Sequence, residues 1–317
     1  MIYQILNESE VVELEKELRK SLPGTAKIYY VIRSYVNGNL QGYEVLVDNW
    51  PSWSCIILRP QSEKQVPKYF SHTYMCHSKS VTSLKYFIQR PGVINWEEPV
   101  TFTGVPNDII PVITELSRKH GATVTSKESR FMYCWTKPEP PPLPQIPDDI
   151  CLGTLEQKHV ETMTDDWEST RYREGLEGYF SGVVQNFDSS CVTDKEGNLL
   201  AYICMQYNGA MAMLYIRPEY RQCGYFNILL SDLTRKRLAK TEVAYAFIPV
   251  QDTQLIKLAR EFGFEWVPEG NMTWIRYNPP AQPNRLSNVT KTVEAKSSNL
   301  EDCLNHLKIN AIPLTTL

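Results

Sequence analysis

The apolar and polar positions in the first half of the chain change their period several times, which predicts a mixture of helices and strands. Val11, Leu14 and Leu18 recur at close to 3.6 residues, as on one face of a helix, and Pro23-Gly24 ends that pattern. A second helix is expected over residues 108–120, with Pro111 in its first turn and Gly121 after its end. Strands are expected over residues 27–36, 41–47, 53–58 and 130–135.

The second half of the chain repeats this alternation of helix and strand periods. A hairpin is expected around the polar turn 194–198, and an amphipathic helix after it, with Ile228, Leu229 and Leu233 on one face. Together the patterns predict a mixed α/β fold. We expect helices beginning near residue 160 and over 176–186, 225–240 and 253–262, and strands over 189–193, 199–206, 210–217, 243–248 and 272–277.

A proline-rich stretch at residues 137–147 divides the chain into two segments of nearly equal size. Proline lacks a backbone N–H and fixes φ, so this stretch is expected to be an extended spacer. The predicted organisation is therefore an N-terminal domain over residues 1–136, a linker over 137–149, a second domain over 150–278 and a flexible tail over 279–317. The tail follows Pro279-Pro280 and is polar with little periodicity.

Composition narrows the class of protein. The chain has 317 residues, of which 42% are hydrophobic and 22% are charged, as in an ordinary globular protein. Lysine and arginine total 33 against 36 acidic residues, a net charge of -3, so a broadly basic nucleic-acid-binding surface is not expected. No apolar run approaches the ~18 residues of a membrane span. The histidines are scattered, and no metal site is expected.

The cysteines and the N-terminus point to an intracellular protein. There are eight cysteines, none in a C-x-x-C pair, which favours free thiols in a reducing compartment. The first residues are acidic and lack the apolar core of a secretory signal.

The most informative segment is a predicted strand, turn and helix over residues 214–226. Free N–H groups at the start of a helix favour anions, and Gly224 there allows a phosphate to approach the backbone. Taken alone, Arg221 followed by Gly224 is a weak signal that favours an ordinary strand-to-helix turn.

The surroundings of this turn resemble the acyl-CoA-binding core of the GNAT superfamily. The residues that match its first motif are Leu214, Ile216, Pro218, Tyr220, Arg221 and Gly224, and those that match its second are Leu258, Gly263 and Phe264. The run Pro218-Glu219-Tyr220-Arg221 is similar to the signature of the glycine N-acyltransferase family. Residues 18–23, 47–53 and 94–96 resemble that family's N-terminal domain in the same order. The resemblance implies two GNAT-like mixed-sheet domains flanked by helices.

The resemblance also implies a function. The expected enzyme transfers an acyl group from acyl-CoA, a co-substrate and not a permanently bound cofactor, to the amine of glycine or a similar small amino acid. Glu219 matches the proposed general base, and partial burial would raise its pKa toward neutrality. The alternative for Glu219 is a solvated loop carboxylate. The residues that would contact acyl-CoA are Leu214, Tyr215, Ile216, Arg221, Gln222, Cys223, Gly224, Tyr225, Phe226 and Asp252.

Two departures from the superfamily pattern keep another interpretation open. Phe226 replaces the last small residue of the phosphate loop, and Ala259 stands where many members carry a tyrosine that protonates the leaving thiolate. A catalytically silent acyl-CoA-binding or regulatory protein is therefore the alternative function. An enzyme that acetylates proteins or polyamines would differ only in its acceptor.

Other features are assigned more simply. Cys223 has no neighbouring histidine in sequence and is expected to be a spectator thiol. Tyr207, Arg171 and Arg173 are candidates for the acceptor site, because an amino-acid carboxylate favours a guanidinium. We expect a monomer. Several family members are mitochondrial, which makes the mitochondrion the expected compartment and the cytoplasm the alternative.

Overall fold

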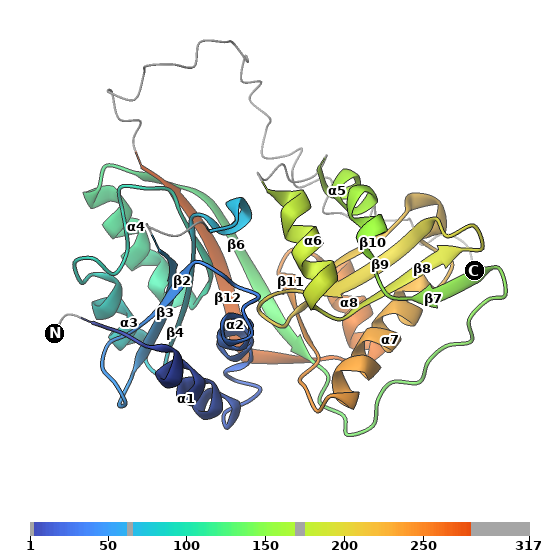
Figure 1. Ribbon diagram of the computed structural model, residues 1–317, viewed down its shortest axis with the longest axis horizontal. Helices are drawn as coiled ribbons and strands as arrows, with labels where there is room; N and C mark the ends of the chain where they lie inside the picture. The colour runs from blue at the N-terminus through green and yellow to red at the C-terminus, as the bar shows by residue number, and fades with distance from the viewer. Residues whose placement is uncertain (1–2, 62–65, 169–174, 280–317) are drawn as a thin grey trace, which may run out of the picture.

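The computed structural model describes residues 3–61, 66–168 and 175–279, which form two lobes side by side (Figure 1). One lobe is built on an eight-stranded sheet and the other on a four-stranded sheet. Helices cover both sheets, so the predicted mixed α/β class is confirmed.

The larger sheet has the strand order β1-β2-β3-β4-β5-β12-β6-β11. Neighbouring strands are antiparallel except for β4 and β5, which are parallel. The strands are β1 (Gln4–Ile5), β2 (Tyr43–Val47), β3 (Cys55–Pro60), β4 (Thr73–Ser78), β5 (Val100–Val105), β6 (Thr123–Cys134), β11 (Tyr245–Pro249) and β12 (Glu265–Asn278).

Two pairs of helices cover opposite faces of this sheet. Successive residues of β2 point to opposite faces. Val45 and Val47 are buried in the same cluster as residues of α1 (Glu8–Arg19) and α2 (Ala26–Val36). Leu46, between them, joins the second cluster, which includes residues of α3 (Val81–Ile88) and α4 (Ile110–Lys119). This alternation is what the two-residue period of a strand requires when both faces are covered.

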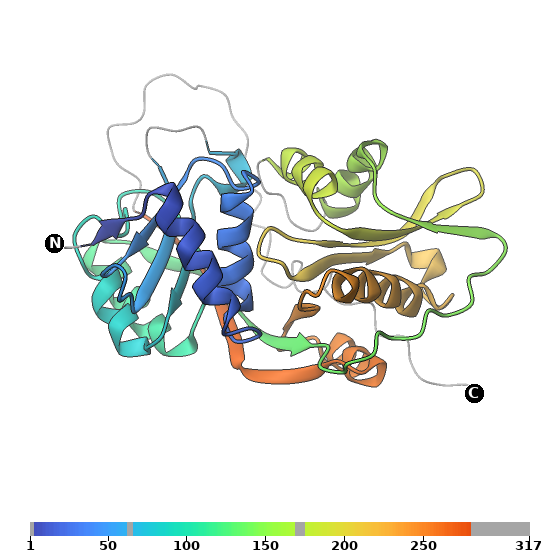
Figure 2. The same ribbon diagram turned by 60° about the horizontal axis from the view of Figure 1, so that its bottom comes forward.

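The smaller sheet is antiparallel throughout, in the order β10-β9-β8-β7. Helices α5 (Val160–Glu168) and α6 (Leu176–Asn186) lie on one face and α7 (Tyr225–Ala239) on the other, as the layers in Figure 2 show. Helix α8 (Thr253–Phe262) joins the cluster on the α7 side. The strands are β7 (Ile150–Gly153), β8 (Ser189–Asp194), β9 (Leu199–Met205) and β10 (Met211–Ile216).

The expected strand over residues 27–36 is wrong, because these residues form α2. The helix lies between the lobes, and its central run, Ile28 to Ile32, is buried on every side. A helix that is apolar all round has no polar face to reveal its period, and a short apolar run of that kind is also typical of a buried strand. The strands β4 and β5 and the helix α3 are additional elements that the sequence patterns do not predict.

Strands from both sides of the proline-rich stretch share the larger sheet. Strand β12, near the end of the described chain, lies between β5 and β6, and β11 pairs with β6 through partners such as Tyr245 and Cys134. The long strands β6 and β12 run from one lobe toward the other (Figure 2). The division of the chain at residues 137–149 therefore stays a prediction, and the two lobes share strands across it.

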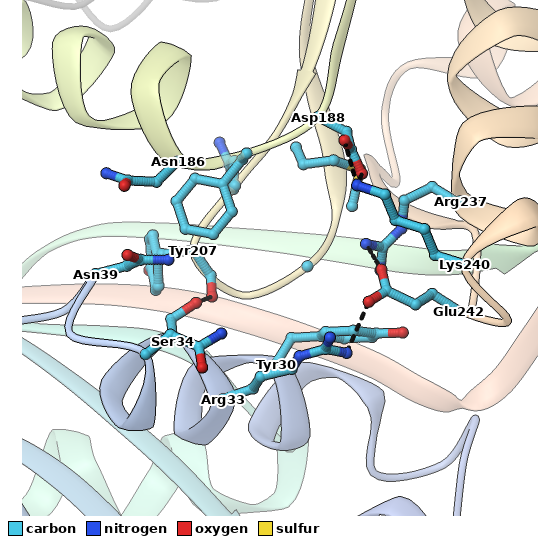
Figure 3. A pocket seen from close by; sticks show the side chains of 15 residues that line it. Tyr30, Arg33, Ser34, Asn39, Asn186, Asp188, Tyr207, Arg237, Lys240 and Glu242 are labelled. Atoms are coloured by element: carbon cyan, nitrogen blue, oxygen red, sulfur yellow. Dashed lines mark hydrogen bonds and ion pairs between the residues drawn. The ribbon is translucent and has the colours of Figure 1, made fainter.

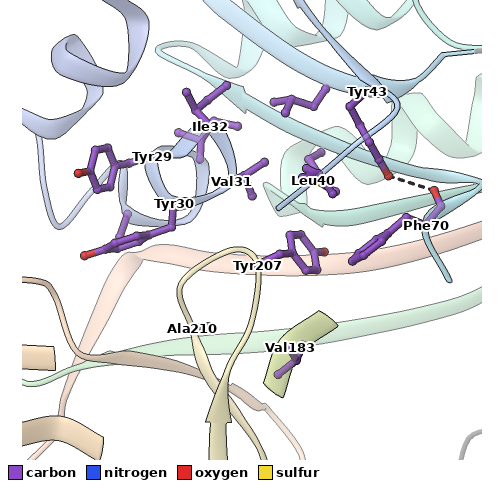
Figure 4. Packing of buried hydrophobic residues seen from close by; sticks show 14 of the residues in the cluster. Tyr29, Tyr30, Val31, Ile32, Leu40, Tyr43, Phe70, Val183, Tyr207 and Ala210 are labelled. Carbon is purple, nitrogen blue, oxygen red and sulfur yellow. Dashed lines mark hydrogen bonds between the residues drawn. The ribbon is translucent and has the colours of Figure 1, made fainter. Parts of the chain in front are cut away.

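The lobes also meet through a buried aromatic contact between α2, the loop before β4 and the β9–β10 hairpin (Figure 4). The ring of Tyr207 meets Phe70 edge to face, with centroids 4.8 Å apart. The Ser34 hydroxyl donates to the backbone oxygen of Tyr207 at 2.6 Å. The Tyr43 hydroxyl donates to the Phe70 oxygen at 3.0 Å. These contacts fix the hairpin from which β10 begins.

Candidate active site

The candidate site is arranged along β10, which is the terminal strand of its sheet. Strand β11 is the terminal strand of the larger sheet and lies next to β10, but no ladder joins them. The outer backbone edge of β10 therefore has no strand partner within the part of the chain that the structure describes. Such an edge presents N–H and C=O groups that an extended ligand can pair with.

A β-bulge interrupts the middle of β10. Ala212 is opposite Cys204 and Tyr215 is opposite Tyr202, so β10 contains one more residue than β9 across this interval. Met213, inside the bulge, has φ of 55°, in the left-handed region that non-glycine residues rarely occupy. Bulges re-aim backbone groups and occur beside active sites. No glycine marks this position in the sequence, so the pattern of strand residues does not reveal it.

The strand ends at a turn that leads into α7. A short 3₁₀ turn, Pro218–Tyr220, follows β10, and Gly224 occupies the residue before the helix with φ of 78°. A side chain at Gly224 would meet no other atom within 4 Å, and no described side chain caps the helix start. The first N–H groups of a 15-residue helix consequently face an open approach, which suits an anion.

The side chains of the turn differ in exposure. Gln222, Cys223 and Gly224 are exposed and Tyr225 is buried. Arg221 is half-buried, and its Nε donates to the backbone oxygen of Ile216 at 3.4 Å. Phe226 is half-buried against the ring of Phe262 of α8, with centroids 6.4 Å apart. The large side chain at position 226 therefore packs toward α8.

Glu219 lies on the 3₁₀ turn, beyond the end of β10, and is exposed. Its exposure matches the alternative of a solvated loop carboxylate, and no burial is present that would raise its basicity. The role of Glu219 as a general base stays a prediction.

Asp252 begins α8 and acts as its N-cap. Its Oδ1 accepts from the backbone N–H of Leu255 at 2.9 Å, and burial raises the pKa of its carboxyl. Ala259, on the same helix, is buried.

The acceptor candidates fall in different places. Tyr207 is buried between the lobes at the start of the hairpin, at the opposite end of β10 from the turn that leads into α7. Arg171 and Arg173 lie outside the described residues.

A cluster that the sequence did not reveal lies against the bulge. Asp166, near the end of α5, is half-buried, and its Oδ2 accepts from the Tyr202 hydroxyl at 3.3 Å. The Tyr215 hydroxyl also acts on this carboxylate and favours its charged form. The rings of Tyr202 and Tyr215 are stacked, with centroids 5.6 Å apart. Burial raises the pKa of Asp166, and the Arg217 cation and the two hydroxyls oppose that rise. The bulge shifts the β10 register, so strand periodicity alone does not place Tyr215 beside Tyr202.

A polar cavity of about 180 Å³ lies elsewhere, between α2, the β9–β10 hairpin and the end of α7 (Figure 3). Its charged side chains are paired with one another, as in the 2.7 Å ion pair of Arg33 with Glu242 and that of Lys240 with Asp188. The 15 residues of α7 extend about 22 Å at 1.5 Å per residue. The cavity is thus at the opposite end of α7 from the turn at residues 217–224.

Neither a metal-ligand cluster nor a membrane-spanning helix is present among the described residues. They contain no group of three histidine, cysteine or acidic side chains placed to hold a metal ion. Within the described ranges, no helix has the length and apolarity needed to cross a membrane.

Known proteins of similar sequence and fold align with most of this chain. The chain is 26% identical over 294 residues to human glycine N-acyltransferase-like protein 2, an alignment covering 85% of this chain and 97% of the relative. It is 24% identical over 279 residues to bovine glycine N-acyltransferase, covering 82% of this chain and 94% of the relative. A crystal structure of a Drosophila protein has the same fold, with a TM-score of 0.71 and 18% identity, covering 87% of this chain and 98% of the other.

The sequence profile described as aralkyl acyl-CoA:amino acid N-acyltransferase matches residues 2–188, more than half of the chain. The chain therefore belongs to the aralkyl acyl-CoA:amino acid N-acyltransferase family and is an acyltransferase.

Proposed function

We propose that the protein transfers an acyl group from acyl-CoA to the amine of glycine or a similar small amino acid. The observation that carries this proposal is the continuity of one surface, which runs from the bulge in β10 along its free edge to the uncapped start of α7. An acyl-CoA has a matching order of groups, with the thioester at one end, an amide-bearing pantetheine arm, and then phosphates.

Each part of the surface has a role in this proposal. The backbone of Gln222, Cys223, Gly224, Tyr225 and Phe226 binds the pyrophosphate, and Arg221 adds a charge-assisted hydrogen bond. The backbone edge of Leu214 to Ile216 pairs with the pantetheine arm. Because the phosphates are held at the turn, the thiol end must extend back along β10 toward the bulge. Asp252, the N-cap of α8, is the remaining residue that the family resemblance assigns to acyl-CoA binding.

The reaction proceeds by direct attack. The acceptor enters as an ammonium group, loses a proton to a protein carboxylate, and its nitrogen attacks the thioester carbonyl carbon. A C–N bond forms, the carbonyl oxygen becomes an oxyanion, and a backbone N–H at the bulge stabilises it. The C–S bond then breaks, the coenzyme leaves as a thiolate, and the nitrogen releases its second proton. Ala259 supplies no acid for the thiolate, so water or another side chain donates its proton in this scheme.

Glu219 is the carboxylate that the family resemblance nominates for the first proton. The test is release of free thiol from acetyl-, benzoyl- and long-chain acyl-CoA, with and without glycine and other amino acids. We expect amine-dependent release by the wild-type protein. If Glu219 is the base, Glu219→Gln lowers turnover by 10²-fold or more with little change in CoA binding. Unchanged turnover in this variant excludes Glu219 as the base and leaves the transfer reaction standing.

The second candidate function is acyl-CoA binding without turnover, which Phe226 and Ala259 favour. It predicts that calorimetry detects CoA binding by a protein that releases no thiol with any acceptor. We predict the mitochondrion as the compartment, with the cytoplasm as the alternative.

A further inference from the structure

We propose that the polar cavity between the lobes binds a small monocarboxylate, such as a hydroxy acid, at a site separate from the groups along β10. The cavity has a volume of about 180 Å³, which is smaller than the roughly 300–1,000 Å³ of sites for drug-sized ligands. Its lining comes from α2, from the β9–β10 hairpin and from the end of α7 (Figure 3). A ligand of few atoms would therefore contact both lobes at once.

The charged side chains that line the cavity carry one more positive charge than negative, because three are cations and two are carboxylates. Lys240 is balanced by Asp188, whose two oxygens lie 2.7 and 2.8 Å from its Nζ. Glu242, in contrast, is shared by the guanidinium groups of Arg33 and Arg237. One guanidinium charge is thus left without a carboxylate in the lining, and it favours a ligand with a single negative charge.

Arg33 is the more accessible of the two guanidinium groups, with its side chain 36% exposed against 7% for Arg237. Glu15 of α1 also attracts Arg33, but it does not line the cavity and forms no ion pair with Arg33 within the described residues. The contacts of Arg33 with Glu242 and with the Tyr29 hydroxyl are both made through Nη1. The other N–H groups of this guanidinium therefore stay available to a carboxylate in the cavity.

Arg237 has a buried donor that lacks a partner. Its guanidinium pairs with Glu242, and its Nη2 donates to the backbone oxygen of Val243 at 3.3 Å. Its Nε–H is buried and makes no hydrogen bond to any residue that the structure describes. A buried donor without an acceptor is unfavourable, so this position favours a bound group that supplies one. A carboxylate oxygen in the cavity is an acceptor of this kind.

The uncharged lining residues favour a polar ligand. Asn39, which follows α2, and Gln206 of the hairpin have half-buried amide groups that can both donate and accept hydrogen bonds. Figure 3 shows Asn39 on the side of the cavity across from Arg237 and Lys240. A carboxylate held near the guanidinium groups would leave the rest of the ligand facing these amides. A hydroxyl or keto group on the carbon next to the carboxylate would then find a partner.

The experiment is calorimetry of the full chain without acyl-CoA, so that binding is measured independently of the proposed transfer reaction. The probes are lactate and lactamide, which differ little in shape but only one of which is charged. We expect lactate to bind with a Kd on the order of 1 mM, since so small a molecule makes few contacts, and lactamide to bind at least about tenfold more weakly. Equal binding of the two probes, or no heat from lactate well above that concentration, overturns the proposal.

The variant Arg33→Gln removes the excess charge from the lining and should weaken lactate binding by about tenfold. Arg19→Gln is the matched control, because Arg19 lies exposed at the end of α1 and does not line the cavity. It should change the Kd by less than about twofold. Thermal unfolding confirms that both variants are folded. Equal Kd values in the two variants place the bound lactate elsewhere and contradict the site.

The variant Asp188→Asn tests the same charge balance in the opposite direction. It leaves Lys240 without its counter-charge, so the lining gains a second excess positive charge. Lactate should then bind about threefold more tightly or better. A gain in affinity does not arise from loss of structure, and unchanged or weaker binding by this variant contradicts the assignment. Inorganic phosphate is the last probe, and tighter binding of phosphate than of lactate by the wild type excludes a carboxylate as the preferred ligand.

Discussion

Gly209 of the β9–β10 hairpin lies against the ring of Tyr30 in α2, so closely that a β-carbon on the glycine would overlap Cβ and Cγ of the tyrosine. Gly209 also has φ of 76°, a conformation that side chains disfavour. The glycine therefore allows the hairpin and the helix to approach, and the hairpin leads directly into β10. Packing between the lobes thus sets the position of the strand that carries the candidate site.

We expect Gly209→Ala to reduce the free energy of unfolding by about 2–4 kcal/mol, because it adds backbone strain to an overpacked contact. Gly197 is the matched control, since it has φ of 88° in another hairpin and a β-carbon there meets nothing within 4 Å. Gly197→Ala should reduce the free energy of unfolding by about 1 kcal/mol, because it adds backbone strain alone. Urea unfolding measures both, and equal losses would show that Tyr30 does not limit the substitution.

Glu242 joins two cations at the same junction of the lobes. It forms a 2.7 Å ion pair with Arg33 of α2 and a second with Arg237 of α7, whose side chain is only 7% exposed. The Arg237 guanidinium also lies 4.8 Å from the centre of the Tyr30 ring. Removal of the carboxylate would leave a buried guanidinium without its counter-charge.

The substitution Glu242→Gln should therefore lower the free energy of unfolding by about 2–4 kcal/mol. Glu115→Gln is the control, because Glu115 pairs with Lys119 on the exposed surface of α4 and should change stability by less than about 0.5 kcal/mol. Denaturant titrations of both variants give the comparison. Similar small effects would mean that the Glu242 network contributes no more than a surface pair.

The lowered pKa of His77 predicts that the stability of the protein depends on pH. Burial, together with the nearby Lys27 and Lys79 cations, lowers the pKa of His77 from 6.5 to about 4. Between these values the unfolded chain binds a proton that the folded protein does not, so stability is full above pH 6.5 and falls as the pH falls toward 4.

The contribution of His77 should be about 1 kcal/mol for each pH unit in this window. Carboxylates also titrate there, but their effect is common to the wild type and to His77→Gln. The difference in unfolding free energy between the two proteins should therefore change with pH between 6.5 and 4. If the unfolding free energies of the two proteins change with pH in parallel, His77 titrates alike in the folded and unfolded protein. The variant His72→Gln, whose position directly precedes the same strand, controls for the loss of a histidine.

The local patterns predict the helices better where one face is polar. Residues 176–186 form α6 as expected, and the helices expected near 225–240 and 253–262 are confirmed as α7 and α8 with small differences at their ends. The sequence pattern predicts a strand in place of helix α2, because a helix buried between the lobes has no polar face. That burial depends on the second lobe, and no local window of sequence contains this information.

The sequence patterns also do not predict which distant strands pair with one another. Strand β12 is apolar enough to be recognised near residues 272–277, but its partners β5 and β6 are more than a hundred residues away. A period of two residues predicts a strand but does not predict which other strand it pairs with. The shared sheet therefore appears only in three dimensions.

The sequence predicts one part of the candidate site and does not predict the other. The turn at residues 217–224, where we propose that the phosphates bind, is a contiguous segment with a glycine before a helix, so the sequence predicts its local structure. The bulge at Met213 has no glycine, and Asp166 comes close to Tyr215 only through the packing of α5 on the sheet. Residues joined by tertiary packing carry no spacing signal, so the motif identifies Glu219, whereas the half-buried Asp166 belongs to no motif.

Arg221 offers a direct test of which end of β10 holds the phosphates. Its Nε binds the Ile216 backbone oxygen, and the rest of its guanidinium has no hydrogen-bond partner among the described residues. If these free N–H groups bind the pyrophosphate, Arg221→Gln should raise KM for acyl-CoA by about tenfold, as expected for one charge-assisted contact. The same variant should leave KM unchanged for an acyl-N-acetylcysteamine thioester, which has the thioester but no phosphates. Lys257→Gln removes an equal charge from the exposed face of α8 and should alter neither value by more than twofold. A tenfold rise for both thioesters would place Arg221 at the reacting end and reverse the proposed direction of the coenzyme along β10.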